Sequence, residues 1–394
     1  MAAGLTNRGV LVLESGVEFP GVLFGAEVSA KSIATSKQGK DFGYGEVVFN
    51  TSMTGYQEVL TDPSYYGQMV CMTTPHIGNT GVNKEDPESA RVWCAGFILN
   101  QSCDDPIHWR SKGNLGEYLK ENGIPGLMGV DTRALTRHIR SQGVVRGVIL
   151  PEAEKGMARG LLADLPRFEG RDLIHEVSTK EPYYWSKGQQ VQTPVQGQDR
   201  YRVVAMDFGI KWNMLHSLEH LGCEVLVVPA KTPAKDILAK NPDGIFLSNG
   251  PGDPSAAPYA VETVRDLLGK VPIFGVCMGH QILCLALGAK TYKLKFGHRG
   301  SNQPVLETTS KKVEISSHNH GYAVDGNTLP RNAEITYVNL NDKTVEGIEI
   351  KEANAFSVQY HPEACPGPHD SALIFDKFIQ GMRENVPKIP RAAR

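Results

Sequence analysis

The chain has 394 residues, 41% of them hydrophobic and 21% charged, and its formal net charge at pH 7 is -2. This composition is that of an ordinary globular protein, and its charge gives no electrostatic basis for binding nucleic acid or an anionic membrane. The seven cysteines show no paired spacing and the N-terminus lacks an apolar signal segment, so we expect a cytoplasmic protein without a membrane-spanning helix.

Glycines and short apolar runs dominate the first part of the chain and predict a mixed α/β domain. Strands are expected at residues 9–13, 45–50 and 68–73, with a hairpin turn at residues 14–16. Helices are expected at residues 115–122 and 131–141, the second with Asp131 as its N-cap and its end before Gly143.

Residues 186–200 are polar, rich in glutamine and almost free of large apolar side chains. Such a segment cannot bury much surface, which is typical of a linker or an exposed loop. We therefore expect an N-terminal domain at residues 1–185, a linker at 186–200 and a second domain at 201–394.

The second domain alternates continuously apolar strands with helices, at residues 202–208, 213–221, 224–230, 244–248, 259–268, 271–276 and 281–287. This alternation predicts an α/β fold with a largely parallel sheet covered by helices, whose ligands bind beyond the carboxyl ends of the strands. Residues 305–360 are richer in strands and turns, and a last helix is expected at residues 371–383.

Cys277 is the candidate nucleophile. It stands in Gly275-Val276-Cys277-Met278-Gly279, between an apolar strand and a helix, and such an elbow presents a nucleophile. A cysteine in apolar surroundings is more often a small core residue, which is the interpretation for Cys284. Cys277 differs because it lies at a helix N-terminus, where the dipole favours a thiolate.

A thiolate nucleophile needs a base, and His361 is the best candidate because it ends an apolar alternating strand. Glu363 lies two residues further on and can orient the imidazole as the third member of a triad. Taken alone, the segment His361-Pro362-Glu363 is explained equally well by a surface turn.

Gly250 and Gly252 follow another predicted strand, and a plain turn accounts for both. Alternatively, backbone N–H groups of this turn point at a developing oxyanion, with the N–H of Met278 as the second donor. Gln281 lies four residues after Cys277, on the same face of the helix, and can reach a polar substrate.

Neither a metal nor a nucleotide is expected in this chain. His318 and His320 are two residues apart, without a carboxylate or cysteine cluster beside them in the sequence and with no Cys-x-x-Cys pair. The segment Gly209-Ile210-Lys211 lacks the glycine spacing of a Walker loop, and no dinucleotide fingerprint occurs.

Taken together, these motifs resemble those of the class I, or triad, glutamine amidotransferases over about residues 202–380. The matching segments are Asn249-Gly250-Pro251-Gly252-Asp253-Pro254, Gly275-Val276-Cys277-Met278-Gly279-His280-Gln281 and His361-Pro362-Glu363-Ala364. The first half of the chain looks like the N-terminal domain of carbamoyl-phosphate synthase small subunits, at residues 49–58, 60–65, 75–79 and 131–136. The resemblance therefore covers nearly the whole chain.

The resemblance implies that Cys277 attacks the side-chain amide of glutamine through a thioester, that His361 transfers the proton and that Glu363 orients His361. The backbone N–H groups of Gly250 and Met278 would form the oxyanion hole. The residues that hold glutamine would be Ser64, Gly250, Gly252, Met278, Gln281, Asn319, Gly321 and Tyr322. Met278 and Tyr322 stand where leucine and phenylalanine are more common in the family. Met278 still offers its backbone N–H as a donor, and Tyr322 still offers an aromatic ring.

Ammonia released in bulk water would become ammonium and lose its nucleophilicity, so its use demands a second active site. The resemblance assigns that site to a partner, the large synthetase subunit, in a heterodimer. With ATP and Mg²⁺ that subunit makes carbamoyl phosphate from bicarbonate and ammonia, for pyrimidine and arginine synthesis. No cofactor is expected in this chain itself.

Three alternatives fit less well. An amidotransferase of another synthetase, for GMP or anthranilate formation, does not account for the N-terminal motifs. A catalytically silent interaction subunit would be expected to have lost its nucleophile, whereas Cys277, His361 and Glu363 are all present. In an α/β-hydrolase the acid precedes the histidine in the chain, whereas here Glu363 follows His361.

Overall fold

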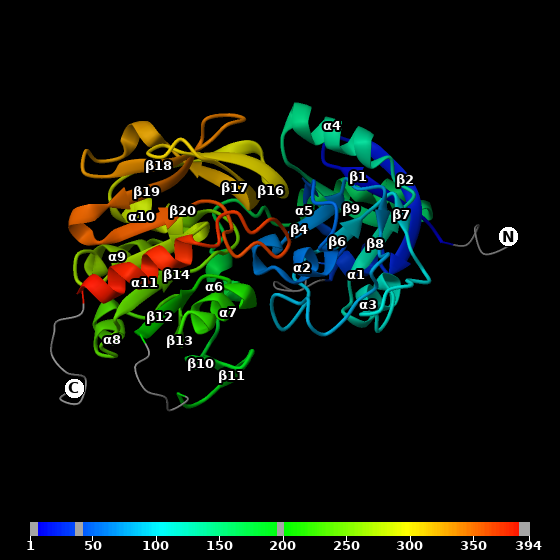
Figure 1. Ribbon diagram of the computed structural model, residues 1–394. Coiled ribbons are helices and arrows are strands. Elements are labelled where there is room, and N and C mark those ends of the chain that lie inside the picture. The colour runs from blue at the N-terminus through cyan, green and yellow to red at the C-terminus, as the bar shows by residue number, and fades with distance from the viewer. Residues whose placement is uncertain (1–6, 36–41, 195–200, 386–394) are drawn as a thin grey trace. The chain divides into compact units, whose positions relative to one another are not determined.

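The computed structural model describes residues 7–35, 42–194 and 201–385, which form two compact units (Figure 1). The first unit contains the chain up to Arg171 together with Leu294–Gly300 and Cys365–Gly367, and the second begins at Asp172. This boundary lies earlier than the predicted linker, because β10 (Tyr183–Ser186) and β11 (Gln189–Val191) are strands of the second unit's sheet. Residues 195–200 of that linker lie outside the described residues.

The first unit is built around a closed barrel with the strand order β1-β2-β8-β6-β4-β3-β9. The barrel closes because β1 pairs with β9 as well as with β2. Four neighbouring strands of the barrel, β3, β4, β6 and β8, run parallel to one another. The strands are β1 Arg8–Leu13, β2 Glu18–Gly25, β3 Tyr44–Asn50, β4 Gln68–Met72, β6 Gly96–Ile98, β8 Pro125–Met128 and β9 Val145–Pro151. A separate parallel pair joins β5 (His76–Ile77) to β7 (Gln101–Ser102).

Successive side chains of the barrel strands face opposite sides, as the pleat requires. Val47 and Met69 pack in one buried cluster, whereas their neighbours Val48 and Val70 pack in another with Leu60. The helices of this unit are α1 Ala30–Ala34, α2 Tyr56–Thr61, α3 Leu115–Glu121, α4 Thr132–Gln142 and α5 Ala158–Asp164, with 3-10 turns at Pro63–Tyr65 (η1) and Glu152–Met157 (η2). The side chain of Asp131 caps α4, as predicted, because it accepts a hydrogen bond from the backbone N–H of Ala134 at 2.8 Å.

The second unit contains a sheet with the strand order β11-β10-β13-β12-β14-β15-β20-β19-β18-β16-β17. Its middle is parallel from β13 to β20, and antiparallel strands extend it on both sides. The remaining strands are β12 Tyr201–Asp207, β13 Cys223–Pro229, β14 Gly244–Leu247, β15 Ile273–Val276, β16 Thr291–Glu307, β17 Val313–Val324, β18 Glu334–Asn339, β19 Val345–Ile350 and β20 Ala355–Val358.

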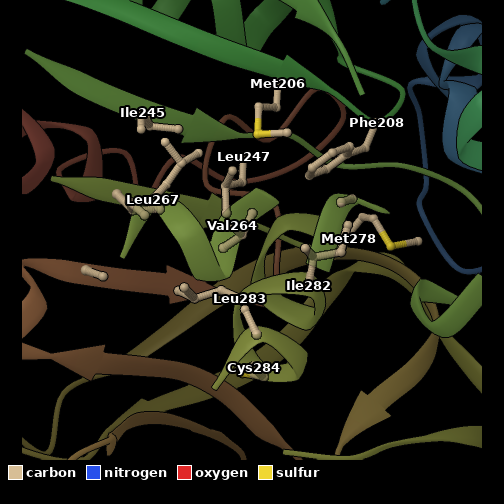
Figure 2. Close-up of a cluster of buried hydrophobic side chains, with 14 of the residues drawn as sticks. Met206, Phe208, Ile245, Leu247, Val264, Leu267, Met278, Ile282, Leu283 and Cys284 are labelled. Carbon is tan, nitrogen blue, oxygen red and sulfur yellow. The ribbon is translucent and has the colours of Figure 1, made fainter. Parts of the chain in front are cut away.

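Helices cover both faces of this sheet. On one face Met206 and Leu247 of the strands pack with Val264 of α9 and Ile282 of α10, as Figure 2 shows. On the other face α7 and α11 pack against alternate strand residues such as Phe246. The helices are α6 Leu173–Val177, α7 Trp212–His220, α8 Ala234–Leu238, α9 Pro258–Leu267, α10 Met278–Ala286 and α11 Ile374–Asn385, with 3-10 turns at Pro254–Ala256 (η3), Gly326–Thr328 (η4) and Lys351–Ala353 (η5).

The α/β prediction is confirmed for this unit, and the predicted strands and helices differ from the observed ones by only a few residues at their ends. Because β12, β14, β15 and β20 run parallel, the segments that follow them leave the same edge of the sheet. Those segments carry Lys211, Asn249, Cys277 and His361. Among the described residues, no helix is long and apolar enough to cross a membrane.

Candidate active site

Cys277 lies between the end of β15 and the first residue of α10, and its backbone has φ 53° and ψ -100°. A non-glycine residue with a positive φ is strained, and such strain is common at functional sites. The neighbouring strand holds this conformation, because the backbone N–H of Cys277 donates to the carbonyl of Val358 in β20 at 2.8 Å. The side chain is buried, and its thiol donates to the carbonyl of Asn319 at 3.6 Å.

The two glycines beside Cys277 are required by close packing. A Cβ atom on Gly275 would lie 2.8 Å from the carbonyl carbon of Gly279, and one on Gly279 would lie 2.2 Å from the carbonyl oxygen of Leu247. Neither separation is possible for real atoms, so both positions exclude every larger residue. The prediction of a tight strand-to-helix elbow is confirmed.

His361 and Glu363 form the predicted pair, and the fold buries both, so the segment is not a surface turn. The ring Nδ1 of His361 donates to Oε1 of Glu363 at 2.8 Å. The backbone N–H of His361 donates to the carbonyl of Ser317 in β17, also at 2.8 Å. The first bond fixes the orientation of the ring and the second holds the segment to β17, while Nε2, which makes no hydrogen bond within the described part of the chain, is left for chemistry.

Lys211 also belongs to the site, although it was not among the residues predicted from the sequence. Its ammonium group donates to Oε1 of Glu363 and to the carbonyl of Ala364, both at 2.8 Å, and its side chain is buried. Asp207, at the end of β12, shapes the turn that leads to Lys211, because its carboxylate accepts from the backbone N–H groups of Gly209 and Ile210. The sequence carries only a partial signal, because Lys211 lies four residues after the end of a buried apolar strand.

Charge within this group decides the protonation of its members. Burial alone would raise the pKa of Glu363, but the charges of Lys211 and His361 outweigh it and lower that pKa to about 2. Burial alone would lower the pKa of His361, but Glu363 and Cys277 outweigh it and raise that pKa to about 10. A carboxylate and an imidazolium are therefore the favoured forms near neutral pH.

The turn after β14 brings its glycines to the same edge of the sheet as Cys277. A Cβ atom on Gly250 would lie 2.1 Å from the carbonyl oxygen of Phe208, and Gly252 has φ +86°. Asn249 is fully buried, and its side-chain oxygen accepts from the backbone N–H of Lys211 at 3.2 Å. This loop is therefore a fixed part of the site, since the Asn249 side chain holds it to the backbone of the segment after β12.

Gln281 lies on the first turn of α10 and is buried. Its amide nitrogen donates to the carbonyl of Tyr322 and to Oε1 of Gln359, both at 2.9 Å. Both amide hydrogens are thus used within the protein, and only the side-chain oxygen is left to accept from a ligand. Gln281 therefore joins α10 to β17, the strand that also contains Asn319 and Gly321.

The fold gathers the predicted residues of the second unit into one region: Cys277, His361, Glu363, Gly250, Gly252, Met278, Gln281, Asn319, Gly321 and Tyr322. Ser64 belongs to the first unit, where it is buried in η1 and its backbone N–H donates to Asp62 at 2.9 Å. Cys284 packs in the hydrophobic core, as predicted, and burial raises the pKa of its thiol.

The fold places a carboxylate beside His318 and His320. In the sequence, no carboxylate accompanies His318 and His320, but the sheet brings Glu346 of β19 to them. Its Oε2 lies 3.7 Å from Nδ1 of His318, and all three side chains are buried.

Comparison with known proteins gives two matching families: glutamine amidotransferase class-I over residues 204–381, and the CPSase domain of the carbamoyl-phosphate synthase small chain over residues 11–149. The carbamoyl phosphate synthase small chain of Syntrophotalea carbinolica is 53% identical, over 96% of this chain and 98% of its own length. That of Synechocystis is 49% identical, over 99% and 100%. The chloroplastic small chain of Oryza sativa subsp. japonica is 47% identical, over 95% and 86%.

Proposed function

The chain belongs to the carbamoyl phosphate synthase small chain family, and from this premise we propose that it hydrolyses glutamine to glutamate and ammonia and delivers the ammonia to a large synthetase subunit. The observation that carries the proposal is the buried pair of His361 and Glu363, 2.8 Å apart, at the strand edge that also presents Cys277 on its strained elbow. A cysteine, a base and an orienting carboxylate are the parts that acyl transfer requires.

The first step is the attack of the Cys277 sulfur on the side-chain amide carbon of glutamine, after its proton has passed to Nε2 of His361. The raised pKa of His361 favours the imidazolium, so this proton is already on the ring when the sulfur attacks. The tetrahedral intermediate then collapses, the carbon–nitrogen bond breaks, and His361 returns the proton to the departing nitrogen, which leaves as ammonia. A thioester remains between the glutamyl group and Cys277.

The second step is the hydrolysis of this thioester. His361, neutral once more, takes a proton from a water molecule whose oxygen attacks the thioester carbon, and the carbon–sulfur bond breaks. Glutamate leaves, and Cys277 regains its initial state. Glu363 keeps the ring of His361 in one orientation throughout and stabilises its charged form.

Both steps develop negative charge on the amide or thioester oxygen. The backbone N–H of Met278 belongs to the first turn of α10, where helical amides have no partner within the helix. Together with the N–H of Gly250 it would form the oxyanion hole, and each such donor contributes about 3 kcal/mol to transition-state stabilisation. Glutamine would be held by the residues Ser64, Gly250, Gly252, Met278, Gln281, Asn319, Gly321 and Tyr322.

The partner in this proposal is the large subunit, which would use ATP and Mg²⁺ to combine ammonia with bicarbonate into carbamoyl phosphate for pyrimidine and arginine synthesis. The family membership and the match of residues 11–149 to the small-chain domain support this part of the proposal. The class of reaction fits the site, because the triad needs only glutamine and water and leaves the energy-dependent chemistry to another subunit.

The test is glutamine hydrolysis by the wild-type chain and by Cys277→Ala, each with and without the large subunit. We expect slow hydrolysis by the wild type alone, faster hydrolysis in the complex, and none from the variant. Cys284→Ala is the matched control, since this second buried cysteine of α10 lies in the core and its loss should leave turnover unchanged. Hydrolysis that survives in Cys277→Ala would contradict the proposed mechanism.

The complex supplies a second readout. With ammonia added in place of glutamine, carbamoyl phosphate formation by the Cys277→Ala complex should continue at the wild-type rate. Glutamine-dependent formation should be lost in the same preparation. If both are lost, the variant damages the assembly itself and Cys277 is not specific to the glutamine reaction.

A further inference from the structure

A cavity in the first unit is lined by the turn after β1, by β9, and by α5 with the segment that follows it. Its volume is about 570 Å³, which lies in the range of cavities that bind small molecules. Arg146, Arg159 and Arg167 line it, and Glu14 is the one acidic side chain among its described lining residues. The cavity therefore has a local excess of positive charge, although the formal net charge of the whole chain is -2.

Arg146 is buried, and its charge is already matched within the protein. Its Nε and Nη2 groups donate to the two carboxylate oxygens of Glu14, at 3.3 and 2.7 Å. The same guanidinium donates to the backbone carbonyls of Leu162 and Leu165, at 2.8 and 2.9 Å. A bidentate pair with its remaining donors satisfied is a structural ion pair. Arg146 and Glu14 together therefore add no net charge to the cavity.

Arg167 is held in position before any ligand arrives. The segment after α5 is fixed by the bonds from Arg146 and by the hydroxyl of Tyr44, which donates to the carbonyl of Pro166. Arg167 comes next in the chain, and its Nη2 donates to Oε1 of Glu14 at 3.0 Å. The other N–H groups of its guanidinium remain for a ligand, and a side chain that is already placed loses less entropy when it binds one.

Arg159 lies on α5 and is exposed, and no hydrogen bond or ion pair engages it within the described part of the chain. Three guanidinium groups and one carboxylate leave the cavity with an excess of two positive charges. A phosphate monoester carries about two negative charges near neutral pH. Arginine forks match the oxygens of such a group in pairs, so Arg159 and Arg167 are suited to a phosphate.

The remaining walls of the cavity are largely apolar. Leu162 and Ala163 follow Arg159 by three and four residues, so they lie on the same face of α5 as the arginine. Val12 of β1 also lines the cavity. A phosphate ion alone would fill only a small part of this volume, whereas an apolar group attached to it would cover these side chains and be removed from water.

We propose that this cavity binds a small organic phosphate, with the phosphate group on Arg159 and Arg167 and the apolar part of the ligand against Leu162 and Ala163. The ligand would connect α5 to the segment after it and to the turn after β1. The site goes beyond the proposed glutaminase activity and does not depend on it, because its residues all belong to the first unit whereas the triad belongs to the second.

The test is isothermal titration calorimetry of the full-length chain in a buffer free of phosphate, with phenyl phosphate as the probe. The wild type should bind one equivalent at least tenfold more tightly than it binds inorganic phosphate, and benzyl alcohol should not bind measurably. Arg159→Gln and Arg167→Gln should each weaken phenyl phosphate binding at least tenfold. No binding to the wild type, or equal affinity for phenyl phosphate and inorganic phosphate, would overturn the proposal.

A second basic cavity of the first unit provides the matched control. Arg137 and Arg140 of α4 line it together with Phe296. The double variant Arg137→Gln/Arg140→Gln removes two charges from the same unit and should leave the affinity for phenyl phosphate unchanged. Loss of binding in this control, with retention in Arg159→Gln, would place the phosphate on α4 and overturn the proposal.

Ala163→Leu tests the apolar part of the cavity without changing a charge. Ala163 is exposed on α5 and leucine is a good helix former, so thermal unfolding of the variant should match that of the wild type. The larger side chain should weaken phenyl phosphate binding at least tenfold, and the affinity for inorganic phosphate, followed by ³¹P NMR, should stay the same. Unchanged affinity for phenyl phosphate would contradict the position assigned to the apolar part of the ligand.

Discussion

Lys211 and Glu363 form an ion pair with both side chains buried, and 2.8 Å separates Nζ from Oε1. The same carboxylate oxygen accepts from Nδ1 of His361, so the orienting carboxylate of the triad is itself oriented by a cation. Lys211 also donates to the carbonyl of Ala364, directly after Glu363 in the chain. The hydrogen bonds therefore link Lys211, Glu363 and His361 in one buried chain, with Lys211 as a positioning residue.

Replacing Lys211 by methionine should both destabilise the protein and impair glutamine hydrolysis. The substitution removes one of the two cations that face the buried Glu363 carboxylate, and breaking a buried ion pair costs about 3–5 kcal/mol. Urea unfolding measures this loss. Steady-state kinetics should show a lower kcat, because Glu363 would no longer hold His361 in one orientation.

The double variant Lys211→Met/Glu363→Gln distinguishes a lost charge pair from lost packing. Since it removes both charges together, it should recover much of the stability that Lys211→Met loses, while hydrolysis stays impaired. Equal instability of the single and double variants would contradict the role assigned to the ion pair.

The lowered pKa of Glu363 predicts a loss of stability in acid. A carboxyl with a pKa of about 2 when folded and 4.5 as its ordinary value stabilises the fold above pH 4.5. This contribution falls away as the pH drops through about 2. The difference in unfolding free energy between the wild type and Glu363→Gln should therefore shrink over this window, and a difference independent of pH would refute the assignment.

The raised pKa of His361 predicts a loss of stability at high pH. A histidine with an ordinary pKa of 6.5 and a folded pKa of about 10 stabilises the fold fully below pH 6.5, and loses this contribution as the pH rises to 10. NMR titration of the His361 ring measures this directly. Because Cys277 is among the causes of the shift, Cys277→Ala should lower the measured pKa, whereas Cys284→Ala should leave it in place.

Much of the fold could be predicted because its signals are local. The apolar strand before Cys277 and the helix after it are visible in the pattern of hydrophobic residues, and Asp131 marks the start of α4 as a capping residue. The closed barrel of the first unit could not be predicted in the same way. Its closure depends on the pairing of Gly9–Leu13 with residues 147–151, and no pattern within either strand specifies so distant a partner.

The residues of the candidate site show the same difference between local signals and distant contacts. Cys277, His361 and Glu363 lie in short motifs that are typical of a nucleophile and its base, so they could be predicted from the sequence. Lys211 and Glu346 contact partners more than twenty residues away in the chain, and nothing beside either residue in the sequence identifies that partner. Only the parallel strand edge and the β17–β19 side of the sheet bring them to their partners.

Gln281→Glu should raise the KM for glutamine and lower stability. The change is nearly isosteric but replaces the amide donor by an acceptor, so the carbonyl of Tyr322 and Oε1 of Gln359 would both lose a hydrogen bond. Leaving such a group unsatisfied costs about 1–3 kcal/mol. The control is Gln380→Glu, an exposed residue of α11 that donates only to Glu384 and whose loss should change neither quantity measurably.

Gly279→Ala should abolish hydrolysis because the elbow cannot accommodate a side chain. The new Cβ would lie 2.2 Å from the backbone oxygen of Leu247, and neither β14 nor α10 can yield without moving Cys277. Overpacking of this kind costs about 1–3 kcal/mol or more. Gly160→Ala in α5 is the matched control: its Cβ meets nothing within 4 Å, so alanine should stabilise that helix by up to about 1 kcal/mol. Thermal unfolding and glutamine turnover of both variants measure the contrast, and a Gly279→Ala chain with wild-type turnover would show that the elbow tolerates a shift that its packing excludes.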